Sequence, residues 1–178
     1  NAVAVLTRTG ENGVLAQATD GSGCITDAAA TGCVTGRELG GANAIATSPA
    51  GVVVYVTSLL SNSVTSFTRA IPAGGLTQKA GTAGCLVWLR AVGCSFGQAL
   101  SAPEGLAVSP DGANVYVAAF ATGAIAVLAR NKSGEVVQLE GRAGCLAPKS
   151  VPGCKRARAL RGVSSVALSP DGRNLYST

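Results

Sequence analysis

Six cysteines are the residues of this chain whose type and spacing most clearly point to chemistry. They form three frames in which two cysteines lie nine positions apart. The frames are Cys24 and Cys33 in GCITDAAATGC, Cys85 and Cys94 in GCLVWLRAVGC, and Cys145 and Cys154 in GCLAPKSVPGC. Six cysteines allow fifteen connectivities, and the threefold repetition favours pairing within each frame. Each disulfide would close a ring of about ten residues and contribute about 2–3 kcal/mol to stability.

Disulfides also predict where the protein works and which other cysteine chemistry is excluded. They form in oxidising compartments, so we expect a secreted, extracellular, cell-surface or periplasmic protein. Zinc sites combine close cysteine pairs, or cysteine with histidine, and the chain contains no histidine. Redox motifs separate their cysteines by two residues, unlike these frames. The sequence therefore predicts no metal and no cofactor.

Candidate catalytic residues are few. Without histidine, the chain cannot form a Ser-His-Asp triad or a Cys-His pair. Most carboxylates lie in expected turns, where Asp bonds its own backbone. Glu104 differs, because it directly precedes an expected strand, and Asn43 and Ser164 take the same place in two related segments. Glu104 is thus a weak candidate acid, and the three polar positions form a candidate ligand site.

Two further features are candidates for ligand binding. Trp88 lies within a cysteine frame, where it could stack on a sugar ring or pack on its own sheet. Three arginines that end matching apolar runs could meet an anionic ligand or bond neighbouring carbonyl groups. These arginines are Arg8, Arg69 and Arg130.

The segment KRARALR holds the densest positive charge of the chain. Its four cations are Lys155, Arg156, Arg158 and Arg161. They could bind an anionic polymer or a glycan, or belong to a solvated loop that follows the last cysteine. No nucleic-acid-binding motif accompanies them, so nucleic acid is not an expected partner.

All these residues belong to a repeat of about sixty residues. Cys24, Cys85 and Cys145 are 61 and 60 residues apart, and the second cysteines follow the same step. Other residue types recur with it, namely the turns at Ser48, Ser109 and Ser169, the tyrosines Tyr55, Tyr116 and Tyr176, the glutamines Gln17, Gln78 and Gln138, and the leucines Leu39, Leu100 and Leu160. The chain therefore contains three copies of one structural unit.

The middle copy predicts four antiparallel strands joined by short turns. The strands cover residues 105–109, 115–120, 124–130 and 135–141, with turns at PDGAN, ATG and NKSG. The first three are apolar at nearly every position, as in a sheet covered on both faces. Repeated four-stranded sheets that stack around an axis are the blades of a β-propeller. We therefore predict an all-β propeller of four-stranded antiparallel blades.

The repeat also sets the expected boundaries. Blades are expected at 42–80 and 102–141, with half-blades at 1–20 (strands three and four) and 163–178 (strands one and two). The disulfide-clipped connectors 21–41, 82–101 and 142–162 are expected to lie outside the sheets. In the propeller, Glu104 would lie close to the mouth of the central channel.

The stretch LAVSPDGANVYVAAFATGAIAVLAR resembles the YVTN-type repeat of secreted and surface propellers and of the lactonase-like propellers. The resemblance covers about 40 residues in each copy. It implies a propeller fold and raises lactonase activity, although lactonase-like propellers use acid, base and arginine positions that cannot be matched here. The resemblance without its chemistry favours a non-enzymatic module.

The two half-blades are complementary, which predicts how the ring is completed. Three blades lie below the usual range of four to eight. The chain is therefore either a fragment of a longer propeller or a subunit that completes its half-blades with another copy. Association would give a six-bladed dimer, or a filament if the rotation does not close.

Three functions follow. The first is a secreted or surface propeller that is non-enzymatic and has a structural, self-assembly or binding role. The second is a lactonase-like hydrolase in which Glu104 and neighbouring polar groups position water. The third is a lectin-like glycan binder that uses the clipped loops around Trp88. A membrane span is not expected, since no apolar run approaches about 20 residues.

Overall fold

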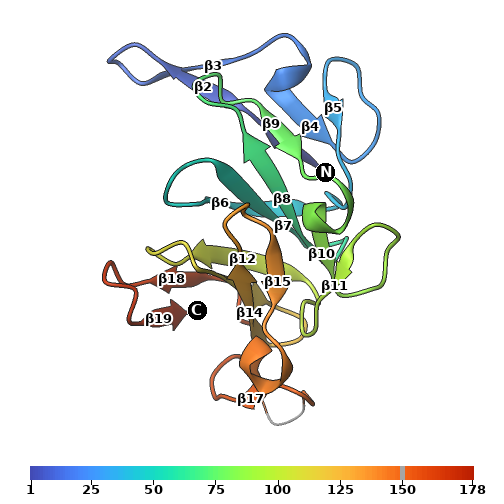
Figure 1. Ribbon diagram of the computed structural model, residues 1–178, viewed down its shortest axis with the longest axis vertical. Coiled ribbons are helices and arrows are strands. Elements are labelled where there is room, and N and C mark those ends of the chain that lie inside the picture. Colours follow the sequence, from blue (N-terminus) through green and yellow to red (C-terminus); the bar gives the residue numbers. More distant parts are fainter. Residues whose placement is uncertain (149–150) are drawn as a thin grey trace.

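The computed structural model describes residues 1–148 and 151–178 and shows an all-β protein (Figure 1). The N-terminal unit contains β1 (Ala2–Ala4), β2 (Leu6–Thr9), β3 (Val14–Gln17), the 3-10 turn η1 (Gly21–Gly23), β4 (Cys24–Thr26) and β5 (Val34–Thr35). The next unit contains β6 (Ala42–Thr47), β7 (Val53–Ser58), β8 (Ser63–Arg69), β9 (Leu76–Gln78), η2 (Gly81–Gly84), β10 (Cys85–Val87) and β11 (Ser95–Phe96).

The third unit repeats this order. It contains β12 (Pro103–Val108), β13 (Asn114–Ala119), β14 (Ala124–Arg130), β15 (Val136–Gln138), η3 (Gly141–Gly144), β16 (Cys145–Ala147) and β17 (Lys155–Arg156). The chain ends with β18 (Val166–Leu168) and β19 (Leu175–Ser177). No helix in the described part of the chain is long and apolar enough to cross a membrane.

Two six-stranded sheets form the centre of the molecule. The first has the order β11-β10-β8-β7-β6, with β9 also paired to β8, and the second has the order β12-β13-β14-β16-β17, with β15 paired to β14. Every residue of β7 is buried, and so are the first five of β8. Both strands are therefore covered on both faces. The apolar sequence of β7 predicts this, whereas β8 (SVTSFTR) also buries the polar residues Ser63, Thr65 and Ser66.

The fourth strand differs from the prediction of one continuous segment over 135–141. It is split in two, because the 3-10 turn η3 separates β15 from β16. Both pieces pair antiparallel with β14, and the same division of β9 and β10 occurs along β8. Gly144 permits the turn, since a Cβ there would overlap the carbonyl oxygen of Leu139.

The cysteine connectors are part of the sheets, so the prediction that they lie outside was wrong. Cys85 begins β10, and Cys94 directly precedes β11, which pairs parallel with β10. The structure joins Cys24 to Cys33, Cys85 to Cys94 and Cys145 to Cys154, with Cα–Cα distances of 4.8, 4.9 and 4.8 Å. Each disulfide therefore fastens a two-residue parallel strand to the outer edge of its sheet.

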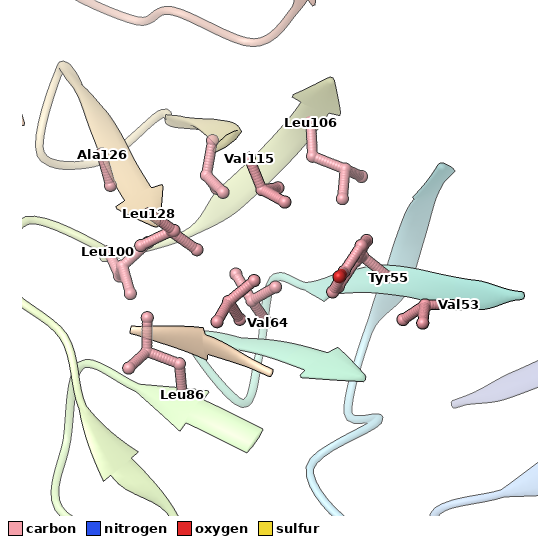
Figure 2. Packing of buried hydrophobic residues seen from close by; sticks show 11 residues of the cluster. Val53, Tyr55, Val64, Leu86, Leu100, Leu106, Val115, Ala126 and Leu128 are labelled. Carbon is pink, nitrogen blue, oxygen red and sulfur yellow. The ribbon is translucent and has the colours of Figure 1, made fainter. Parts of the chain in front are cut away.

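Hydrophobic clusters hold successive sheets together. The main cluster lies between the two six-stranded sheets. Figure 2 shows Val64 and Leu86 of the first sheet facing Leu128 of the second, with Leu100 of the connector between the sheets next to Leu128. Leu100 is fully buried, and burying a leucine side chain stabilises the folded state by roughly 1.5–3 kcal/mol. The equivalent leucines Leu39 and Leu160 fill the clusters on either side. The recurring leucine is thus a packing residue at each junction between sheets.

A buried tyrosine crosses the junction between the six-stranded sheets. The Tyr55 hydroxyl donates to the carbonyl oxygen of Gly134 at 2.8 Å and accepts from Nε of Arg130 at 2.9 Å. Burial raises the pKa of Tyr55 above its ordinary value of 10.0, and the Arg130 charge opposes this only in part. The neutral phenol is therefore the form that stabilises the fold.

This contact predicts a pH dependence. Because the folded pKa of Tyr55 is raised, its contribution is complete below pH 10.0 and is lost as the pH rises through the folded value. Tyrosinate absorbance should be titrated in the unmodified protein and in Tyr55→Phe. We expect the difference curve to have its midpoint above pH 10.0; a midpoint at or below that value would contradict the buried contact.

The chain ends remain apart. β2 and β3 form a two-stranded sheet, and β18 and β19 form another. Figure 1 shows β2 and β3 at the top of the molecule and β18 and β19 away from them, beside β12 in the lower half. No described residue of β18 or β19 pairs with β1, β2 or β3, so the sheets do not close into a ring within this chain.

Candidate functional site

Two adjacent strands carry a polar residue at a β-bulge. On β6 the register with β7 shifts between Ala42 and Ala44, which leaves Asn43 as the extra residue. On β12 the register with β13 shifts between Pro103 and Gly105, which leaves Glu104 in the same situation. Bulges interrupt a ladder and redirect a side chain, and they are frequent beside active sites. The pairing thus singles out two of the three polar positions expected at the channel mouth.

The third position, Ser164, lies beside the bulge of β12. A Cβ at Gly105 would come within 2.6 Å of the Ser164 carbonyl oxygen and 2.9 Å of Ser165 Cα. Glycine is required there, because the three nearest atoms all belong to the backbone and cannot rotate away. β12 also contacts β6 on one side and β18 on the other, so Asn43, Glu104 and Ser164 belong to three neighbouring segments.

Glu104 is a half-buried carboxylate that has no hydrogen-bond partner and no ion pair among residues 1–148 and 151–178. Most other acids of the chain have local roles. The carboxylates of Asp111 and Asp171 accept from Ser109 and Ser169 within their turns, and these hydroxyl groups together with backbone N–H groups lower the pKa of both. Glu104 is therefore available to act on a ligand.

Asn43 offers an amide donor at the equivalent bulge of the neighbouring strand β6. The Thr57 hydroxyl, which is buried, donates to Asn43 Oδ1 at 2.9 Å. This bond directs the acceptor end of the amide to Thr57, and Nδ2 has no partner in the described part of the chain. These neighbouring segments therefore carry a proton acceptor in Glu104 and an amide donor in Asn43, which suits a neutral polar ligand with a carbonyl group. The Ser164 hydroxyl donates to the Thr178 carbonyl oxygen at 3.4 Å. Within 1–148 and 151–178, no three His, Cys, Asp or Glu side chains gather as metal ligands would.

The repeated arginines bond carbonyl groups of the protein. Nη1 of Arg130 donates to the Gly112 carbonyl at 3.3 Å, and Nη1 of Arg69 donates to the Gly51 carbonyl at 3.2 Å. Arg8 donates to the Glu11 carbonyl at 3.4 Å. The arginines thus hold turns, and the structure does not bring them to Glu104.

The two loop candidates lie elsewhere. Trp88 is half-buried, packs against the main cluster and stacks on Phe96 with ring centroids 6.1 Å apart. The guanidinium carbon of Arg90 lies over the Phe96 ring, 5.5 Å from its centroid. The cations Lys155, Arg156, Arg158 and Arg161 are exposed. The three arginines line an open groove of about 530 Å³ together with Phe120 to Gly123.

The sequence did not reveal that Tyr55 and the repeated glutamines bond neighbouring units. Both residue types recur once in each repeat, and this recurrence was the one sign that they have a shared role. The pattern alone does not show which groups they bond. The glutamine amides bond the connector of the preceding unit, as Gln78 does with Arg37.

No protein-family model and no curated protein matches the sequence. The structure is similar to a periplasmic gluconolactonase from Pseudomonas aeruginosa, with a TM-score of 0.59, 22% identity, and 99% of this chain and 42% of that one covered. It is also similar to a candidate 6-phosphogluconolactonase from Bacteroides uniformis, with a TM-score of 0.59, 19% identity, and coverage of 99% and 43%.

These similarities support the lactonase-like part of the resemblance, whereas no family model supports the YVTN part. At such identities they establish the fold and leave activity open. The three disulfides point to a compartment outside the cytoplasm. The chain shares its fold with part of these two β-propeller proteins and spans less than half of their length.

Proposed function

We propose that this chain supplies the catalytic edge of a lactonase-like propeller, with Glu104 as the general base for lactone hydrolysis. The observation that carries the proposal is the unpartnered, half-buried carboxylate at the β12 bulge. The sequence alone favoured a non-enzymatic module. The gluconolactonase and the candidate 6-phosphogluconolactonase of the same fold support the hydrolase instead.

The proposed reaction uses groups of this chain only. Glu104 accepts a proton from water as the water oxygen attacks the lactone carbonyl carbon. Nδ2 of Asn43 donates to the carbonyl oxygen as negative charge develops on it. The ring C–O bond then breaks, and the departing alkoxide takes the proton from Glu104. The product is the open hydroxy acid, and the carboxylate is regenerated.

The prediction is that Glu104→Gln lowers lactone hydrolysis by at least about 100-fold, because the amide cannot accept the proton. A panel of sugar lactones and simple aliphatic lactones should be assayed with the purified chain. Glu140→Gln is the matched control, since Glu140 is exposed and lies beside η3 in another part of the sheet. Equal turnover by the two variants, or none by the unmodified chain, would contradict the proposal.

A second candidate is a non-enzymatic module that assembles or binds. It is favoured by the two-stranded sheets β2–β3 and β18–β19, which are the expected half-blades and have no partner sheet in the described chain. Under this proposal, each chain supplies two whole blades, at 42–80 and 102–141. Two composite blades, each built from half-blades of both chains, complete a six-bladed dimer, and a filament forms if the rotation does not close. Glycan binding at the clipped loops has less support, because one face of Trp88 is occupied by Phe96.

A further inference from the structure

The glutamines form one contact that is made twice in this chain. Oε1 of Gln78 accepts from the Arg37 backbone N–H at 2.8 Å, and its Nε2 donates to the Arg37 carbonyl at 3.0 Å. Gln138 makes the same two bonds to the backbone of Gln98. Each glutamine thereby joins the fourth strand of its own unit to the connector that arrives from the previous unit.

The two halves of a third such contact are present but separate. Nε2 of Gln17 donates to the Gly23 carbonyl at 2.7 Å, just as Gln78 and Gln138 bond Gly84 and Gly144. Its Oε1 has no partner among the described residues. Sixty residues after Gln98, Arg158 likewise has a backbone N–H and carbonyl that bond nothing in the part of the chain that the structure describes.

The side chain next to this contact adds a charge pair. Where the contact is complete, the Arg37 guanidinium reaches the following unit and donates to the carbonyls of Gly81 and Gly93. Arg158 is the counterpart of Arg37, and Asp20 is the counterpart of Gly81. Both Arg158 and Asp20 are exposed in this chain. Bringing the two surfaces together would place a cation beside a carboxylate.

The tyrosine contact is divided in the same way. Tyr55 is fully buried by Arg130 and Gly134 of the following unit, whereas Tyr116 is half-buried and Tyr176 is 62% exposed. The arginines that correspond to Arg130 for these two are Arg8 and Arg69. The N-terminal face thus offers the glutamine and the arginines, and the C-terminal face offers the backbone of Arg158 and the tyrosines.

We propose that a second copy of this chain docks its N-terminal face on this C-terminal face. Gln17 of one copy bonds the Arg158 backbone of the other, and Asp20 pairs with the Arg158 side chain. Tyr116 and Tyr176 bond Arg8 and Arg69. These contacts would hold the exchanged half-blades together. The proposal therefore rests on the second candidate function, the module that assembles through its half-blades. It commits to a second copy because both complementary faces belong to this chain and reproduce its internal junction.

The test uses opposite charges on separate copies. Sedimentation velocity should measure the mass of the full chain, of Asp20→Arg, of Arg158→Asp, and of an equimolar mixture of the two variants. Each variant alone would face like charges at every junction, so its dissociation constant should rise about tenfold or more. In the mixture, one junction has the native pair and the other the reversed pair, so association should return. Gln17→Ala should weaken association without recovery in any mixture.

Arg90→Asp is the control, because Arg90 is exposed and lies at neither face. Circular dichroism checks that every variant is folded. A dimer or a filament that dissociates with the single variants and returns in the mixture supports the docking. A stable monomer of 17.5 kDa for the unmodified chain overturns it, as does a mixture that behaves like its separate components. Mass is the readout, so failure here is separate from an absence of lactonase activity.

Discussion

Removing the third disulfide by Cys145→Ala with Cys154→Ala is expected to lower the free energy of unfolding by about 4–5 kcal/mol. Loss of the ten-residue ring accounts for about 2–3 kcal/mol of this. The remainder comes from packing, because both cysteines are buried with Ala99, Ala124 and Ala147, and each lost sulfur atom leaves a small cavity worth about 1 kcal/mol. Denaturant unfolding monitored by circular dichroism measures the change.

The first disulfide provides the matched comparison. Cys24 and Cys33 close a ring of the same size but are only half-buried. Removing them should therefore cost the ring contribution alone, about 2–3 kcal/mol. Equal losses for the two pairs would show that packing around the third disulfide contributes nothing. Losses below 1 kcal/mol in both would contradict the view that the rings hold the outer strands.

The strands of the sheets could be predicted where local sequence decides them. β13 and β14 lie within a residue of the expected 115–120 and 124–130, because both are continuous apolar runs between glycine-containing turns. The outer strands could not be predicted. β16 and β17 have three and two residues, and their pairing depends on the disulfide and on the distant edge of β14. Such short segments carry too little pattern to distinguish a strand from a loop.

The candidate site was predictable in position and unpredictable in geometry. The repeat aligned Glu104 with Asn43 and Ser164 because all three precede a first strand. The bulges at Asn43 and Glu104 depend on the register with β7 and β13, which the residues themselves do not encode. The bond from Thr57 to Asn43 likewise joins two strands and has no counterpart in the linear pattern.

The expected consequence of Gly105→Ala follows from the same bulge. Its new methyl group would lie 2.6 Å from the Ser164 carbonyl oxygen and 2.9 Å from Ser165 Cα. Both are backbone atoms, so no side-chain rotation relieves the overlap, and β12 and the segment before β18 must separate. Overpacking of this kind costs about 1–3 kcal/mol. We expect a loss in that range, concentrated at the β18–β19 sheet.

Gly75→Ala is the control for the change of residue type, because its Cβ would meet only Ser22 Cβ, at an ordinary 3.6 Å. That variant should change the free energy of unfolding by less than about 0.5 kcal/mol. Hydrogen exchange gives the local readout: the amides of β18 and β19 should lose protection in Gly105→Ala, while those of β7 and β8 keep theirs. Since Glu104 adjoins the displaced residue, lactone hydrolysis should fall in Gly105→Ala and persist in Gly75→Ala. Unchanged protection of β18 in Gly105→Ala would show that the two segments do not meet at this glycine.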